Sequence, residues 1–88
     1  MFNNERFLIS KDKYWGGVAY RFLFPNGYGA NVVKNPYSYG GEKDLWEITV
    51  LYNDLPDYDT PITNFVLGWK NDTEVENVLR RIQELPWK

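Results

Sequence analysis

The segment VAYRFLFPNGYGANVVK, residues 18–34, places two apolar-rich runs on either side of Pro25, Asn26 and Gly27. This tripeptide is typical of a bulged hairpin turn, because proline presets φ at its first position and glycine adopts the positive φ that closes it. The sequence therefore predicts a central β-hairpin over residues 18–34. Because side chains alternate along a strand, Arg21 and Asn31 are expected on one face. The opposite face is expected to carry Val18, Tyr20, Phe22, Phe24, Tyr28, Ala30 and Val32.

The chain is small and rich in aromatic residues, and it lacks cysteine and histidine. Its 88 residues are interpreted as one domain, 1–88, and a chain of this length buries only a modest share of its surface. Aromatic residues make up 18% of the chain, which compensates because large rings bury much area at little rotamer cost. Without cysteine or histidine, disulfides, thiolate or imidazole metal sites and His-dependent nucleophilic catalysis are excluded. We therefore expect no enzymatic activity, no metal and no cofactor.

The charges are nearly balanced, with ten Lys and Arg against twelve Asp and Glu. Proteins that bind nucleic acid gather their basic residues on one face, whereas this chain scatters them, so nucleic-acid binding is disfavoured. The first residues do not resemble a signal peptide, and no run approaches the roughly 18 apolar residues of a membrane span. The sequence thus favours a cytoplasmic protein without a membrane partner.

Other segments extend the predicted sheet to about four strands. Residues 5–9 are expected to form a short edge strand, and residues 58–60 another that Pro61 limits to an edge. Residues 62–69 fit a strand or a helical turn, with Phe65, Val66 and Leu67 buried in either case. Residues 45–52, LWEITVLY, alternate as a strand, and the side chains expected to face the core are Trp46, Ile48, Val50 and Tyr52.

A C-terminal helix is predicted after Asn71, because Asn71 and Glu74 have the spacing of a capping box. Pro86 is expected to end the helix, and Trp69 and Trp87 are expected to cover its two ends. The apolar residues of the segment form one stripe at helical spacing: Val75, Val78, Leu79, Ile82 and Leu85. This stripe needs a partner, and the aromatic face of the sheet is large enough. The predicted fold class is therefore α+β, an antiparallel sheet with one C-terminal α-helix packed on one face.

Two groups of carboxylates have the residue types that metal binding or acid–base chemistry needs. Asp54, Asp57 and Asp59 provide the oxygen ligands that hard cations prefer, but the segment lacks the central glycine and distal glutamate of a calcium loop. A solvated acidic turn is the favoured interpretation. Glu47 and Asp59 would suit acid–base catalysis as a pair, but nothing in the sequence brings them together.

The loop Tyr37-Ser38-Tyr39-Gly40-Gly41 is the best candidate for a binding surface. Rigid amphipathic rings beside small hydrogen-bonding residues are typical of recognition loops. The alternative is that one tyrosine closes the core while the glycines bend the strand. Aromatic-Gly-Gly sequences occur at 15–17 and 39–41, and both are interpreted as bulges where a loop enters a strand. If these corners lie at one end of the sheet, Tyr14 and Trp15 join Tyr37, Ser38 and Tyr39 in one partner-binding site.

Four motifs together resemble a group of small proteins encoded by phages and prophages of Gram-positive bacteria. They are the FPNGYGA turn, the YSYGG loop, the LWE strand and the YDTPIT segment, within residues 20–85. The resemblance implies a viral protein that acts in the host cytoplasm, and it transfers no catalytic residues. Small accessory phage proteins are often inhibitors of host or defence machinery.

The leading hypothesis is a non-enzymatic phage accessory protein that binds and modulates a host bacterial protein, for example as an anti-defence, anti-CRISPR-like inhibitor. A second hypothesis is a protein that sequesters a small, nucleotide-like signal between aromatic rings. A third is a structural or assembly role in the virion. Homo-oligomerisation is left open.

Overall fold

The computed structural model describes residue 2 and residues 5–87, and the predicted central hairpin is present in it. Strand β2 (Gly17–Leu23) pairs antiparallel with β3 (Tyr28–Lys34), with Tyr20 opposite Val32 and Phe22 opposite Ala30. The Phe24 amide donates to the Tyr28 carbonyl at 2.8 Å, and Gly27 has φ +87°. Both findings confirm the predicted register and turn.

A second hairpin precedes the central one, and here two predictions were wrong. Residues Glu5–Phe7 form a short 3-10 helix, η1, rather than an edge strand. Strand β1 (Leu8–Tyr14) instead runs through the polar segment 10–13 and pairs with β2. Trp15 and Gly16 have φ of +50° and +80°, so the first aromatic-Gly-Gly corner is a two-residue hairpin turn and not a bulge.

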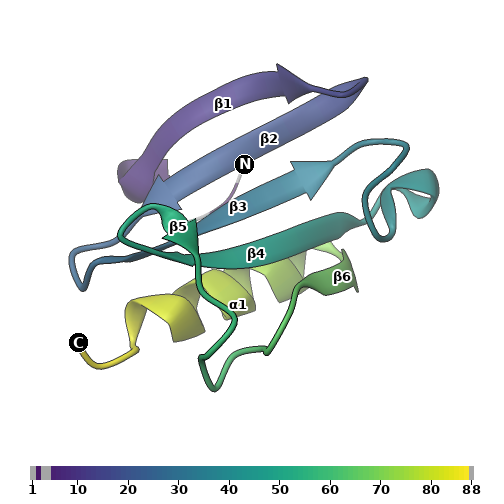
Figure 1. Cartoon of the computed structure of the whole chain (residues 1–88). Helices are drawn as coiled ribbons and strands as arrows, with labels where there is room; N and C mark the ends of the chain where they lie inside the picture. Colours follow the sequence, from purple (N-terminus) through teal and green to yellow (C-terminus); the bar gives the residue numbers. More distant parts are fainter. Residues whose placement is uncertain (1, 3–4, 88) are drawn as a thin grey trace.

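The sheet has six strands rather than about four, in the order β1-β2-β3-β4-β5, with β6 also paired to β4 (Figure 1). Strand β4 (Trp46–Tyr52) carries β5 (Leu55–Pro56) near one end and β6 (Leu67–Lys70) near the other. Residues 58–60 form no strand, and the ambiguous segment becomes a strand only from Leu67. Phe65 was wrongly expected to be buried, since its residue surface is 54% exposed, and Val66 and Leu67 are only partly buried.

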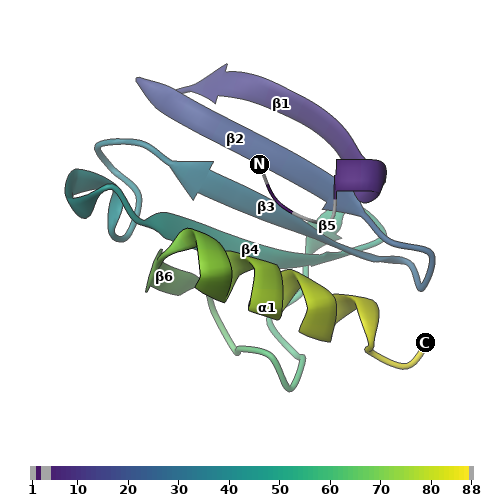
Figure 2. The ribbon, with the colours of Figure 1, turned by 180° about the vertical axis from the view of Figure 1, so that it is seen from behind.

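Helix α1 (Asp72–Gln83) lies across one face of the sheet, in front of it in Figure 2. Asn71 caps it as predicted: the Glu74 amide donates to Asn71 Oδ1 at 2.8 Å, and the Asn71 amide donates to Glu74 Oε1 at 2.9 Å. The whole predicted apolar stripe is buried, and so are the inward-facing rings of the sheet apart from the partly buried Tyr52, which confirms the packing of helix on sheet. The helix ends at Gln83, three residues before Pro86.

Trp69 and Trp87 do not cover the helix ends as expected, since both residues are exposed. Two other residues complete the core. Phe2 is buried and packs edge-on against Tyr20 and Trp46, at centroid distances of 5.5 and 5.4 Å. Asn26, in the central turn, is 4% exposed, and its amide nitrogen donates to carbonyl oxygens at the end of α1. No helix in the described part of the chain is long and apolar enough to cross a membrane.

Candidate functional site

The candidate site lies on the sheet face opposite α1, which is the side seen in Figure 1. The pairing register places residues of four strands next to one another in two rows across this face. We call them the carboxylate row, Asp12, Ala19, Val33 and Glu47, and the polar row, Ser10, Arg21, Asn31 and Thr49. The carboxylate row has acidic side chains at its ends and the smaller apolar side chains of Ala19 and Val33 between them. The surface of the sheet is therefore depressed in the middle of this face.

The polar row is held by a network around Arg21. Its Nε donates to Asn31 Oδ1 at 3.2 Å, and its guanidinium pairs with the Asp54 carboxylate at 3.2 Å. Arg21 and Asn31 therefore lie on the face predicted from strand alternation. The ion pair also means that the positive charge of Arg21 is already balanced by a carboxylate from the turn after β4.

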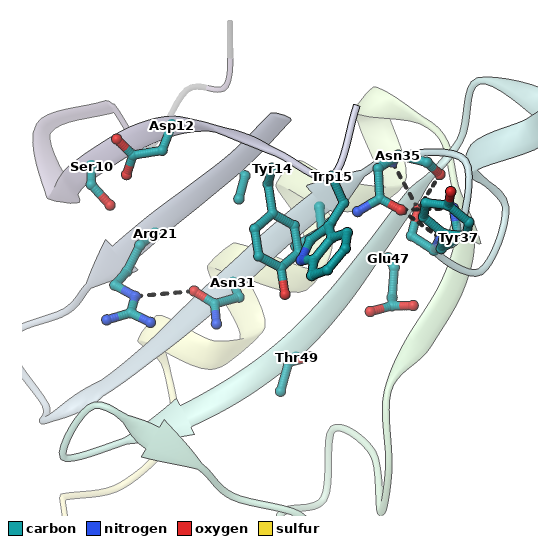
Figure 3. A pocket seen from close by; sticks show the side chains of 13 residues that line it. Ser10, Asp12, Tyr14, Trp15, Arg21, Asn31, Asn35, Tyr37, Glu47 and Thr49 are labelled. Carbon is teal, nitrogen blue, oxygen red and sulfur yellow. Dashed lines mark hydrogen bonds between the residues drawn. The ribbon is translucent and has the colours of Figure 1, made fainter. Parts of the chain in front are cut away.

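Three aromatic side chains rise at the end of the sheet beyond the carboxylate row (Figure 3). Tyr14 ends β1, and the positive φ of Trp15 turns the chain there. The Trp15 and Tyr37 rings meet edge to face, with centroids 6.5 Å apart and planes at 89°. The two corners thus lie at one end of the sheet, and the Trp15 and Tyr37 residues are 70% and 82% exposed.

The loop that presents Tyr37 is fixed by Asn35. The Asn35 side-chain oxygen accepts from the Tyr37 and Ser38 amides, each at 2.8 Å. Ser38 Oγ in turn accepts from the Asn35 amide at 3.0 Å. The exposed tyrosine therefore sits on an ordered turn, which lowers the conformational entropy that binding would otherwise cost.

The residues of the two rows and the aromatic side chains beside them line a hollow of about 750 Å³ that is open to solvent on the sheet face. Four of the five predicted partner-binding residues line it: Tyr14, Trp15, Tyr37 and Ser38. Glu47 also lines it, below the Trp15 and Tyr37 rings in Figure 3. Its Oε1 accepts from the Tyr39 amide at 2.9 Å, which ties the carboxylate to the loop.

Tyr39 is the predicted site residue that the structure places elsewhere. Its ring packs against Trp69 at 5.4 Å and Phe65 at 6.4 Å, away from the residues that line the hollow. The reason is that residues 35–40 form consecutive turns and not extended chain, in which side chains two residues apart would share one side. The Ser38 amide donates to the Asn35 carbonyl at 3.2 Å, and the Gly41 amide donates to the Ser38 carbonyl at 3.1 Å. Gly40, with φ +97°, then begins the 3-10 helix η2 (Gly41–Lys43), so the second aromatic-Gly-Gly corner is not a bulge either.

The two faces of the sheet carry different charges, with lysines on the helix side and carboxylates on the uncovered face. Lys11 and Lys34 lie on the helix side, where their ammonium groups stand 5.3 Å from the Tyr20 ring and 4.2 Å from the Trp46 ring. Lys13 is paired with Val18 and so shares that side. The uncovered face carries Asp12 and Glu47, with Arg21 as the basic group lining the hollow. The hollow is therefore acidic overall once Asp54 is counted.

Sequence reasoning missed most of the floor of the hollow. Alternation identified Arg21 and Asn31, but it assigned no structure to the polar residues around Asp12 and did not bring Glu47 together with them. Within residues 2 and 5–87, no group of three or more Asp or Glu side chains is placed to hold a metal ion. The Asp57 carboxylate accepts from the Asp59 amide at 2.9 Å, a local contact within its turn.

Comparisons with known proteins identify no relative of this chain. No protein-family model, curated protein or solved structure matches the chain.

Proposed function

We propose that this protein is a non-enzymatic phage accessory protein that binds a host bacterial protein through the hollow on its uncovered sheet face. Modulation of a host defence component is the activity that this proposal favours. The observation that carries the binding proposal is the exposed pair of rings, Trp15 and Tyr37, held in fixed positions beside a concave surface. The phage origin rests on the sequence resemblance alone.

Two physical arguments support binding at this place. The energy of protein–protein binding concentrates in a few large anchors, among which tryptophan, tyrosine and arginine are enriched. Trp15 and Tyr37 contribute little to the core, since both residues are largely exposed. Aromatic residues that the fold leaves exposed around a depression are therefore better explained by a partner than by stability.

A small molecule is the second candidate ligand, and the size of the hollow favours it. Sites for small ligands commonly enclose about 300–1,000 Å³, a range that includes this one. A ligand with a flat ring would stack on Trp15 or Tyr37. Nucleotides tested by thermal shift would raise the melting temperature if such a ligand occupied the site.

The test is capture of a partner by an immobilised, tagged protein from lysate of a Gram-positive host, with identification by mass spectrometry. The wild type is compared with the double variant Trp15→Ala/Tyr37→Ala. Each anchor is expected to contribute about 2 kcal/mol, so loss of one should weaken binding of the same partner about 30-fold and the double variant should bind it about 1,000-fold more weakly. Its melting temperature should stay close to that of the wild type, because neither ring is in the core.

Two controls locate the binding surface. Trp87→Ala removes an exposed tryptophan that does not line the hollow and should leave capture unchanged. Tyr39→Ala removes the tyrosine on the other side of the loop. Capture that survives the double variant, or is lost only with Tyr39→Ala, would contradict the proposal.

A further inference from the structure

We propose that the hollow receives an arginine side chain from an exposed segment of the partner, with its guanidinium stacked at the Trp15–Tyr37 corner and paired with Glu47. This inference rests on the proposed function, since it specifies the chemistry of the group bound at the same site. It follows from three features of the uncovered face, which are its charge, its ring geometry and its shape.

The first feature is charge. Two carboxylates, Asp12 and Glu47, lie in the same row, and the basic group beside them, Arg21, is already paired with Asp54 at 3.2 Å. The lysines of β1 and β3 lie on the opposite face. An incoming cation that pairs with Glu47 would therefore meet no unbalanced positive charge, whereas a phosphate would meet a carboxylate that repels it. Asp12, at the other end of the row, adds to the negative potential of the face without contacting the same group.

The second feature is the arrangement of the rings. The faces of tryptophan and tyrosine attract cations, most strongly when the cation lies within about 6 Å of the ring centroid. The Trp15 and Tyr37 ring planes are nearly perpendicular, at 89°. The two rings therefore form a corner in which the face of one ring lies beside the edge of the other. Tyr14 lines the same hollow, and Glu47 lies beneath the corner (Figure 3). Rings beside a carboxylate are the groups that bind a flat cation.

The third feature favours arginine over lysine. A guanidinium is planar, stacks on aromatic faces and presents several N–H donors to a carboxylate at once. The floor next to Glu47 is formed by Val33 and Ala19, whose small side chains leave room for the methylene stem. Thr49 lies one row further and offers a hydroxyl oxygen as acceptor, whereas the side-chain oxygen of its neighbour Asn31 already accepts from Arg21 Nε.

The experiment uses NMR titration of the full chain with an acetylated and amidated peptide, Gly-Gly-Arg-Gly-Gly. The matched probe replaces arginine by citrulline, which keeps the shape of the side chain but removes its charge. The arginine peptide should shift the Trp15 indole signal and the amide signals of Tyr37 and Glu47. The citrulline peptide should bind at least about two- to fivefold more weakly, as expected for the loss of one exposed ionic contact. Added salt should weaken the binding of the arginine peptide alone.

Variants then identify the carboxylate. Glu47→Gln removes the charge but keeps a side-chain oxygen for the Tyr39 amide, so the loop should stay in place. It should weaken binding of the arginine peptide about two- to fivefold and leave the citrulline peptide unaffected. Glu42→Gln changes an exposed glutamate outside the hollow and should alter neither titration.

The alternative outcomes are distinct. Equal binding of the arginine and citrulline peptides, or no effect of Glu47→Gln, would overturn the inference. A lysine peptide that binds as tightly would overturn the assignment to arginine, and adenosine monophosphate that binds more tightly would favour the small-molecule candidate. If the host partner is lost with Trp15→Ala/Tyr37→Ala but retained by Glu47→Gln, the proposed function stands and only this inference fails.

Discussion

Asn26 should be one of the most sensitive polar positions in the protein. Its side-chain nitrogen donates to the carbonyl oxygens of Ile82, Gln83 and Leu85, at 2.9, 3.2 and 3.0 Å. Its side-chain oxygen accepts from the Tyr28 amide at 3.0 Å. One buried side chain thus closes the central turn and donates to carbonyls in the last turn of the helix, where intrahelical amide donors run out. The Ile82 carbonyl also accepts from the Leu85 amide at 3.2 Å.

The cost of Asn26→Ala follows from these contacts. The amide has two protons, which the three carbonyls share, so two donated bonds and one accepted bond are lost. At about 1 kcal/mol for each net hydrogen bond, the free energy of unfolding should fall by about 3 kcal/mol. For a domain of this size that corresponds to a decrease in melting temperature of about 12–24 °C. Asn64→Ala, at an exposed loop position, is the control and should cost less than about 0.5 kcal/mol.

Asn26→Asp tests the same reasoning through pH. The introduced carboxylate keeps the size of the side chain, but it faces carbonyl oxygens in a buried site, which raises its pKa above the usual value of about 3.9. Only the protonated form can donate. Measured against Asn26→Ala at each pH, the variant should be most stable below pH ~3.9 and lose that advantage as pH rises through the raised pKa.

Urea unfolding followed by circular dichroism measures all three variants. A loss below about 1 kcal/mol for Asn26→Ala would refute the reasoning, because it would mean that water replaces the side chain at no cost. An Asn26→Asp variant as stable as the wild type at pH 7 would refute it independently.

Three further changes test the packing by the same unfolding assay. Gly27→Val should cost about 1–3 kcal/mol, because φ is +87° and a Cβ would stand 3.1 Å from the Tyr52 ring; a wild-type melt would refute the turn. Leu79→Ala should cost about 2–5 kcal/mol while Arg80→Ala, on the exposed face of α1, costs less than about 0.5; equal losses would contradict the packing of the stripe. Phe2→Ala should cost about 3–5 kcal/mol, and an unchanged stability would show that the N-terminal ring is not part of the core.

The fold was predictable wherever a single local signal determined it. Pro25, Asn26 and Gly27 determine a turn, and the turn sets the register of β2 and β3. The Asn71 cap and the apolar stripe likewise define α1 and its buried face. Strand β1 was missed because an edge strand with polar side chains on both faces has no apolar alternation, and because Trp15 and Gly16 are not the usual residues of a two-residue turn.

Strand β5 was missed, and the segment that contains β6 was left ambiguous between a strand and a helical turn, for a related reason. Both are held by pairing with β4 at separate ends, which is a tertiary interaction, and Leu55–Pro56 is too short to show any period. The capping role of Asn26 was invisible for the same cause, since its partners lie 56–59 residues away in sequence. Local patterns contain no information on such distant contacts.

The aromatic part of the candidate site could be predicted from residue types, whereas its charge could not be predicted without the pairing register of the strands. Tyr14, Trp15 and Tyr37 were chosen as candidates by residue type, because rigid rings beside small hydrogen-bonding residues are typical of recognition loops. The charge of the hollow depends instead on Asp12 and Glu47 lying on the same face at the two ends of one row, across three strand pairings. A shift of any pairing by one residue would send one carboxylate to the helix side and replace it with a neighbour of different charge. The proposed preference for a cation is therefore a property of the assembled sheet, and Glu47→Gln tests it without disturbing that assembly.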